Sequence, residues 1–195
     1  RVEAVAEKLS KTCALIYLGA GTSGRLAVAD AAECPPTFGV PYEQVLAIPA
    51  GGERTMFRAA ENEEDDPNSS VEELKKRNLT AKDVVVGISA SGGAAYVCGA
   101  LRYARELGCV TVAVVCNPNS RMEQEAEITI VADTGPEVLT GSTRLKAGNA
   151  QKMVLNMLST AVMIKGGHVY ENLMINLKPT NKKLRRRMIG IVTDI

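Results

Sequence analysis

Five short apolar runs punctuate the chain and are separated by longer segments of mixed polarity. The runs are CALIYLG (13–19), QVLAIPA (44–50), DVVVGIS (83–89), VTVAVVC (110–116) and EITIVA (127–132). Their near-continuous apolar character is typical of parallel strands that are covered on both faces of a sheet. The pattern therefore predicts five buried strands.

Segments with helical periodicity lie between these runs. They span residues 23–33, 53–63, 70–78 and 94–107, and another helix-like stretch precedes the first run. Strands that alternate with helices in this way form α/β folds in which the strands run parallel. We therefore expect a doubly wound, mainly parallel five-stranded sheet flanked by helices.

An apolar stripe at helical spacing follows the fifth run, and its members are Met153, Met157, Ala161 and Ile164. Two candidates for the N-terminal cap of this helix, Ser142 and Thr143, precede it. The segment is interrupted by polar residues and is shorter than the ~18 residues that a membrane span requires. It predicts a long, largely buried helix whose methionines fill the core, because methionine adapts to irregular packing.

Composition and charge restrict the class of protein. The 195 residues are 46% hydrophobic, and 23 basic side chains balance 22 acidic ones to a formal net charge of +1. The length and the apolar content predict one globular domain. The balanced charge provides no overall electrostatic field that would attract nucleic acid or an anionic membrane. Five cysteines without C-x-x-C spacing and the lack of an export signal favour reduced thiols and a cytoplasmic location.

A glycine-rich loop, LGAGTSGRLA (18–27), follows the first apolar run and has the spacing G-x-G-x-x-G. Such loops let backbone N–H groups and a helix N-terminus face an anion. A dinucleotide site also needs an acidic residue at the end of the second strand, whereas the second run ends in AIPAGG with no acid before Glu53. The loop therefore favours an anion smaller than a dinucleotide.

Two further loops carry short hydroxyl side chains, SASGG (89–93) after the third run and TGSTR (140–144) before the long helix. The three loops together supply the candidate ligand-binding residues Gly21, Thr22, Ser23, Ser89, Ser91, Gly92, Ser142 and Thr143. Hydroxyls and backbone amides suit a phosphate monoester, and Arg25, Arg144 or Lys146 would add positive charge. We expect a sugar phosphate as ligand; the alternative is that these side chains only cap helices and close turns.

Acidic residues in two segments are candidates for proton transfer. Glu33 precedes Pro35 and Pro36, which we expect to end the first long helix, so its carboxylate would face the negative end of the helix dipole. Glu61 and Glu64 lie three residues apart among other carboxylates, a crowding from which the sequence predicts proton transfer by one of them. An exposed glutamate without a role and a solvated acidic loop are the alternatives. Two carboxyl groups beside a sugar phosphate fit isomerisation and elimination equally.

Several long motifs of the chain resemble the N-acetylmuramic acid 6-phosphate etherases of the sugar isomerase (SIS) domain superfamily. They are YLGAGTSGRLAVADAAECPPTFGV (17–40), AAENEED (59–65), DVVVGISASG (83–92) and GPEVLTGSTRLKAG (135–148). The resemblance implies cleavage of a D-lactyl ether to give N-acetylglucosamine 6-phosphate and D-lactate, in cell-wall sugar recycling, without a metal or redox cofactor. It also implies that residues 1–195 are a single SIS domain of a longer chain, and that the protein is a homodimer with sites near the subunit interface.

The resemblance assigns roles to individual residues. The family's proton donor falls on Glu33 and its second catalytic glutamate, the base, falls on Glu64. Glu137 and Lys146, which lie in the motif GPEVLTGSTRLKAG (135–148), are also expected to bind the substrate. Gly93, Ala94 and Ala95 replace the family's usual Arg-Thr-Pro beside the expected phosphate loop.

Two other functions remain open from the sequence. One is a non-catalytic SIS module that senses a sugar phosphate, as the related glucokinase regulatory protein does, and the other is a sugar-phosphate isomerase. A sensor needs no pair of proton carriers, whereas this chain has both Glu33 and Glu64. An isomerase would use the carboxylates but would leave the etherase-like motif ECPPTFG (33–39) without a purpose.

Overall fold

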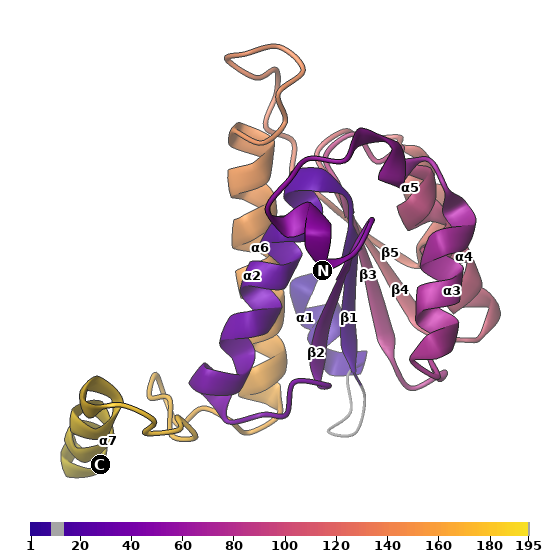
Figure 1. Ribbon diagram of the computed structural model, residues 1–195. Coiled ribbons are helices and arrows are strands. Elements are labelled where there is room, and N and C mark those ends of the chain that lie inside the picture. The colour runs from indigo at the N-terminus through magenta and orange to yellow at the C-terminus, as the bar shows by residue number, and fades with distance from the viewer. Residues whose placement is uncertain (9–13, 195) are drawn as a thin grey trace.

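A computed structural model describes residues 1–8 and 14–194 and contains one parallel sheet (Figure 1). Its strands are β1 (Leu15–Gly19), β2 (Val45–Pro49), β3 (Val84–Ser89), β4 (Val110–Val115) and β5 (Ile128–Val131). They pair in the order β2-β1-β3-β4-β5, and every pair is parallel. The predictions of five strands and of an α/β fold are confirmed, because each strand lies within one of the apolar runs.

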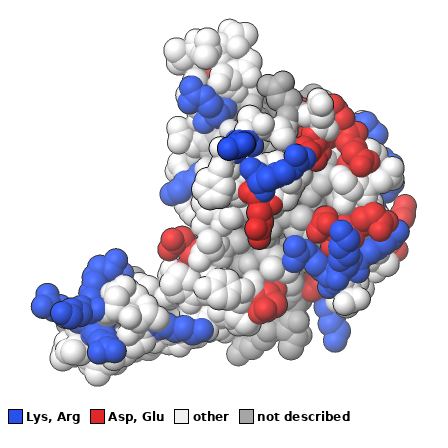
Figure 2. Space-filling model, in the orientation of Figure 1, with Lys and Arg blue, Asp and Glu red and all other residues white. Residues whose placement is uncertain are grey.

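Helices cover both faces of this sheet. They are α1 (Val2–Lys8), α2 (Gly21–Phe38), α3 (Pro67–Lys76), α4 (Ala95–Glu106), α5 (Arg121–Glu125), α6 (Lys146–Lys165) and α7 (Lys182–Asp194). Figure 1 shows α1, α2 and α6 on one face and α3, α4 and α5 on the other, while α7 extends away from the sheet. Lys and Arg side chains gather on α7 (Figure 2). None of the described helices is long and apolar enough to cross a membrane.

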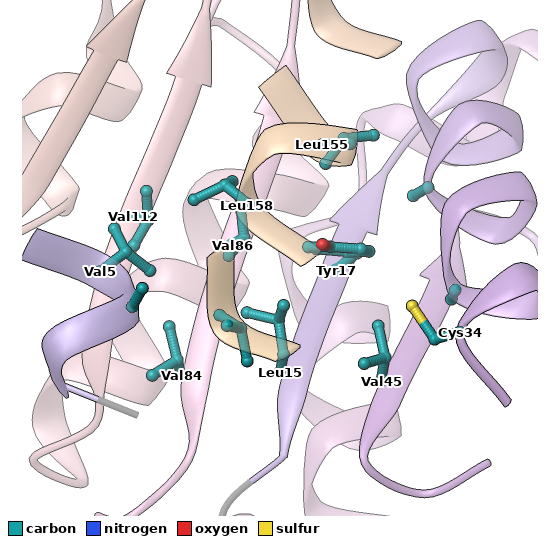
Figure 3. Packing of buried hydrophobic residues seen from close by; sticks show 14 of the residues in the cluster. Val5, Leu15, Tyr17, Cys34, Val45, Val84, Val86, Val112, Leu155 and Leu158 are labelled. Atoms are coloured by element: carbon teal, nitrogen blue, oxygen red, sulfur yellow. The ribbon is translucent and has the colours of Figure 1, made fainter. Parts of the chain in front are cut away.

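The core consists of two apolar layers, one on each face of the sheet. Side chains alternate along a strand, so Leu15 and Tyr17 enter the layer under α2 and α6, and Ile16 and Leu18 enter the layer under α4. Figure 3 shows Tyr17 in the first of these layers, together with Leu155 and other apolar side chains. Burial on both faces explains why the runs are apolar throughout rather than alternating.

A buried carboxylate connects α2 to β1 and α6. Asp30 accepts hydrogen bonds from Tyr17 Oη (3.1 Å), Asn156 Nδ2 (2.6 Å) and Ser159 Oγ (3.1 Å). Burial, and the negative charge of Asp30, raise the pKa of Tyr17 well above its usual value, so the phenol keeps its proton and remains a donor. The network fixes α2, whose N-terminus lies at the candidate site, against α6.

Helix α2 continues through the two prolines that we expected to end it. It runs to Phe38 and stops at Gly39, whose backbone has a φ of 71° and whose N–H donates to the Pro35 carbonyl at 2.9 Å. Each proline removes only one backbone hydrogen bond, and the left-handed glycine then closes the helix. Glu33 therefore lies within the helix, five residues before its end, and not at its C-terminus.

Two other helix predictions need correction. Residues 53–63 form no continuous helix but two short 3₁₀ turns, η1 (Glu53–Met56) and η2 (Glu61–Glu64). Helix α5 was not predicted, although the S-x-x-E spacing of Ser120 and Glu123 signals it and forms a capping box in the structure.

The methionine stripe of α6 lies on the surface of the single chain. Met153 is 63% exposed, Met157 is 49% exposed and Ile164 is 51% exposed. The buried face of α6 is instead formed by neighbouring positions, which include Val154, Leu155, Leu158 and Val162. Because apolar residues lie on both the buried and the exposed face of this helix, periodicity alone does not reveal which face meets the sheet. The prediction that these methionines fill the core is wrong for the single chain.

Candidate active site

A cavity of about 320 Å³ opens at the carboxyl ends of β1 and β3. The chain passes from β1 to one side of the sheet and from β3 to the other, and ligands of open α/β sheets bind at such switch points. The cavity is lined by Ala20, Gly21, Thr22, Ser23, Glu64, Ile88, Ser89, Ala90, Ser91, Ala94, Gly141 and Thr143. Three loops and η2 therefore meet at one place, as the fold requires.

The N-terminus of α2 forms one wall of the cavity. Its N-cap residue, Ala20, offers no side-chain acceptor, so the first backbone N–H groups of the helix are available to a ligand. The glycines bring this terminus against β1, because a Cβ at Gly24 would lie 2.5 Å from the Gly19 oxygen. The G-x-G-x-x-G spacing thus serves close packing of strand and helix, with the positive end of the helix dipole at the cavity.

The loop after β3 supplies hydroxyl donors on the opposite wall. Ser89 Oγ accepts from the Gly92 N–H and Ser91 Oγ accepts from the Gly93 N–H, both at 3.2 Å, and the two hydroxyl oxygens are 3.4 Å apart. Since backbone donors already engage their oxygens, at least one hydroxyl hydrogen stays free for an oxygen of a ligand. Gly92 itself supports the loop from behind and does not line the cavity.

Glu64 is the carboxylate that lines the cavity. It is exposed at the end of η2, on the segment that connects β2 to α3. Its neighbour Glu63 forms an ion pair with Arg54. The side chain of Glu61, with which we expected Glu64 to pair, lies outside the described part of the structure.

Glu33 does not line this cavity. It is exposed on α2, twelve residues after Gly21, which corresponds to about 18 Å along the helix axis. One chain therefore does not bring Glu33 and Glu64 to a common cavity.

The N-terminus of α6 is occupied by a side chain of its own loop. The carboxylate of Glu137 accepts from the backbone N–H groups of Lys146 (2.9 Å) and Ala147 (3.0 Å), and these bonds lower its pKa. The Lys146 ammonium donates to the Thr134 carbonyl at 2.7 Å. Neither Glu137 nor Lys146 lines the cavity, and Ser142 does not line it either, whereas Thr143 does.

Replacing Glu137 by Gln is expected to lower the melting temperature at pH 7. The folded-state pKa of Glu137 is depressed, so its stabilisation is present above the unfolded-state pKa and is lost as pH falls through the folded value. The difference from wild type should therefore shrink in acid, when measured by thermal unfolding between pH 7 and pH 3. Glu43→Gln, at an exposed site, is the matched control; an equal loss in both variants would contradict the capping role.

Basic side chains are absent from the described lining of the cavity. Arg25 is held by a hydrogen bond from Nε to the Thr55 carbonyl at 3.0 Å, and Arg144 is exposed. Within residues 1–8 and 14–194, no group of three or more His, Cys, Asp or Glu side chains is arranged to hold a metal ion. An anion in this cavity would be met by neutral donors of the chain, namely backbone amides and hydroxyls.

Two family models match the chain. The glucokinase regulatory protein N-terminal SIS domain matches residues 1–105, and the SIS domain matches residues 66–161. The first match alone covers more than half of the chain.

Curated relatives are similar over almost the whole chain. The N-acetylmuramic acid 6-phosphate etherase of Clostridium beijerinckii is 55% identical over 191 residues, which is 98% of this chain and 63% of that protein. The etherase of Yersinia pestis is 55% identical over 193 residues, or 99% of this chain and 65% of that protein. The resemblance stated from the motifs is thereby confirmed, and the chain spans just under two thirds of the length of these relatives.

A solved structure has the same fold at low sequence identity. The NanR protein of Vibrio vulnificus, complexed with ManNAc-6P, superposes with a TM-score of 0.59 at 12% identity, over 99% of this chain and 59% of that one. A likeness at this identity shows the fold alone.

Proposed function

The chain belongs to the SIS-domain family, and on that basis we propose that the full-length protein cleaves the D-lactyl ether of N-acetylmuramic acid 6-phosphate. Relatives that are 55% identical carry the name of this etherase, and the products of the cleavage would be N-acetylglucosamine 6-phosphate and D-lactate. The observation that carries the proposal is that Glu64 faces the same cavity as the α2 N-terminus and the Ser89 and Ser91 hydroxyls. The donors suit a phosphate group, and the carboxylate suits a proton acceptor.

The reaction proposed is an elimination followed by addition of water. In the open-chain sugar the aldehyde acidifies the C2 proton, which passes to the Glu64 carboxylate. The C3–O bond breaks, and the leaving lactate oxygen takes a proton from the Glu33 carboxyl group. Water then adds to the double bond: its hydroxide goes to C3 and its remaining proton to Glu33, while Glu64 returns a proton to C2, which restores both carboxyl groups.

We propose that the second carboxyl group comes from a second copy of the chain. Glu33 and the small residues Ala29 and Ala32 are exposed on α2, which packs beside α6, and α6 exposes Met153 and Met157. A continuous apolar stripe on a surface helix is typical of a protein interface. This face therefore supports the assembly of the chain as a homodimer.

A two-fold axis provides the geometry that one chain lacks. If the axis crosses α2 near its midpoint, between Gly21 and Glu33, the end of one α2 lies opposite the beginning of the other. The partner subunit's Glu33 would then approach the cavity mouth at the N-terminus of α2. The small side chains of Ala29 and Ala32 would allow the two helices to approach closely.

A lactate assay on the purified full-length protein tests the proposed activity. We expect D-lactate and N-acetylglucosamine 6-phosphate to appear in equal amounts from N-acetylmuramic acid 6-phosphate. The match to the glucokinase regulatory protein domain favours one rival function, a sensor that binds the sugar phosphate without turnover. Ligand-induced stabilisation without lactate would support that sensor, and ketose formation without lactate would support an isomerase.

The described residues also support a proposal about domain and compartment. We infer that residues 1–195 form a single SIS domain, since one sheet and its two core layers organise the chain.

The four described cysteines are free and buried, and burial raises the pKa of Cys34 to about 12. Unreactive free thiols of this kind suit a reducing compartment, and we propose the cytoplasm.

A further inference from the structure

A buried amide lies directly behind the wall of the cavity. Gln151 is 1% exposed on the inner face of α6, and its Oε1 accepts a hydrogen bond from Ser23 Oγ at 2.9 Å. Its Nε2 is buried and has no hydrogen-bond partner among the described residues. Ser23 is 8% exposed, lies in the first turn of α2 and lines the cavity. An unpaired donor therefore sits one side chain away from the candidate phosphate position.

Both orientations of this amide leave one of its polar atoms unpaired. In the observed orientation Ser23 gives its hydrogen to Gln151 and presents only an acceptor to the cavity. When the carboxamide turns over, Nε2 donates to Ser23 Oγ and the serine hydrogen is released toward the cavity. The two ends of a carboxamide are similar in size, so the rotation needs little space, and the unpaired group changes from a donor to an acceptor.

We propose that Gln151 is a positioning residue that sets whether the Ser23 hydroxyl donates to, or accepts from, a ligand in the cavity. An oxygen of a bound phosphate selects the turned orientation, because it gains a charge-assisted hydrogen bond from Ser23. A sugar hydroxyl both donates and accepts, so it fits either orientation. The identity of the ligand, a sugar phosphate, rests on the function proposed above.

The orientation of the Gln151 amide matters for binding because of the composition of the cavity. No basic side chain of the described residues lines the cavity, so an anion depends on each neutral donor that the walls supply. Ser23 stands in the first turn of α2, where its hydroxyl adds to the free backbone N–H groups. A serine whose hydrogen is held inward contributes nothing to a phosphate, and one whose hydrogen is free contributes a full donor.

Three single variants of the full-length protein, together with the Ser23→Ala/Gln151→Glu double variant, separate this role from simple packing. Gln151→Met keeps the size of the side chain and leaves the Ser23 hydrogen free. Gln151→Glu places a carboxyl group there whose ionised form only accepts, and so holds the Ser23 hydrogen inward. Ser23→Ala removes the hydroxyl and serves as the reference for a lost donor. Dissociation constants for N-acetylglucosamine 6-phosphate and for inorganic phosphate are measured by calorimetry, with the melting temperature of each variant alongside.

We expect Ser23→Ala and Gln151→Glu each to weaken binding of the sugar phosphate by about 10-fold or more, the scale of one hydrogen bond to a charged group. The double variant should bind no more weakly than either single variant, since both remove the same donor. Gln151→Met should bind like wild type and melt no lower, because it removes the unpaired amide. If Gln151→Glu does not fold, weakened binding by Gln151→Met or unchanged binding by Ser23→Ala would still overturn the inference.

Equal weakening by Gln151→Met and Gln151→Glu would overturn the inference, as would unchanged binding by Ser23→Ala. Wild-type protein that binds neither probe would also overturn it. The measurements use binding and not turnover, so they are separate from the lactate assay. Protein that shows the expected variant pattern but releases no lactate would refute the etherase proposal and leave the role of Gln151 intact.

Discussion

Replacing Glu64 by Gln in the full-length protein is expected to reduce lactate release by about 100-fold or more, the usual scale for loss of a general acid or base. The amide keeps the shape of the side chain that lines the cavity but cannot take the C2 proton. Glu33→Gln should cause a similar loss, because the leaving oxygen would depart without a proton. Initial rates at saturating N-acetylmuramic acid 6-phosphate measure both effects.

Binding measurements distinguish a chemical role for these glutamates from a structural one. Both variants should still bind N-acetylglucosamine 6-phosphate and should melt near wild type, since Glu33 and Glu64 are exposed in the single chain. Asp65→Asn, at the exposed position next to Glu64, is the matched control and should retain activity. Near-normal rates for Glu64→Gln would refute its role as the base.

Mixing the two inactive variants is expected to restore activity, if the partner subunit's Glu33 completes each site. In an equal mixture that exchanges subunits, half of the dimers carry one Glu33→Gln and one Glu64→Gln subunit. One of the two sites in such a dimer has both carboxyl groups and the other has neither, so about a quarter of the wild-type activity should return. Co-expression of the two variants with different tags, followed by sequential purification, provides the pure mixed dimer, which should show about half of the wild-type activity in the lactate assay.

The same experiment can refute the shared site. If each chain supplied both of its own carboxyl groups, every site in the mixture would lack one of them and the activity would stay at the level of the single variants. A wild-type protein that remains monomeric by light scattering would refute it as well. Charged substitutions at the exposed apolar stripe, such as Met157→Glu, offer a control that should separate the subunits without touching the cavity.

The strands and the glycine loop followed from local sequence. A strand buried on both faces must be apolar throughout, so runs such as DVVVGIS (83–89) identify it wherever it lies in the sheet. Gly24 is required because any side chain there would meet the backbone of β1, a constraint that acts within one strand-to-helix connection. The meeting of the hydroxyl-bearing loops was predicted from a general rule of the fold, because parallel strands place their carboxyl ends at one edge of the sheet.

The partners of individual side chains did not follow from the sequence. Glu137 belongs to a motif that suggested substrate binding, but its carboxylate holds the N-terminus of α6. Glu33 was expected beside Glu64, yet it lies on α2 about three turns beyond the helix N-terminus at the cavity. Gln151 could not be singled out from the sequence, because its role depends on a hydrogen bond with Ser23, which lies 128 positions away along the chain.

The sequence by itself therefore determined which segments are strands, how the chain turns at the glycine loop and which family the motifs indicate, because these depend on residues close together along the chain. Only the tertiary structure decided which face of α6 is buried and which side chains reach the cavity. Apolar side chains lie on more than one face of α6, so the local pattern does not select the buried face. The contacts that select it join residues more than a hundred positions apart, as Asp30 and Ser159 do.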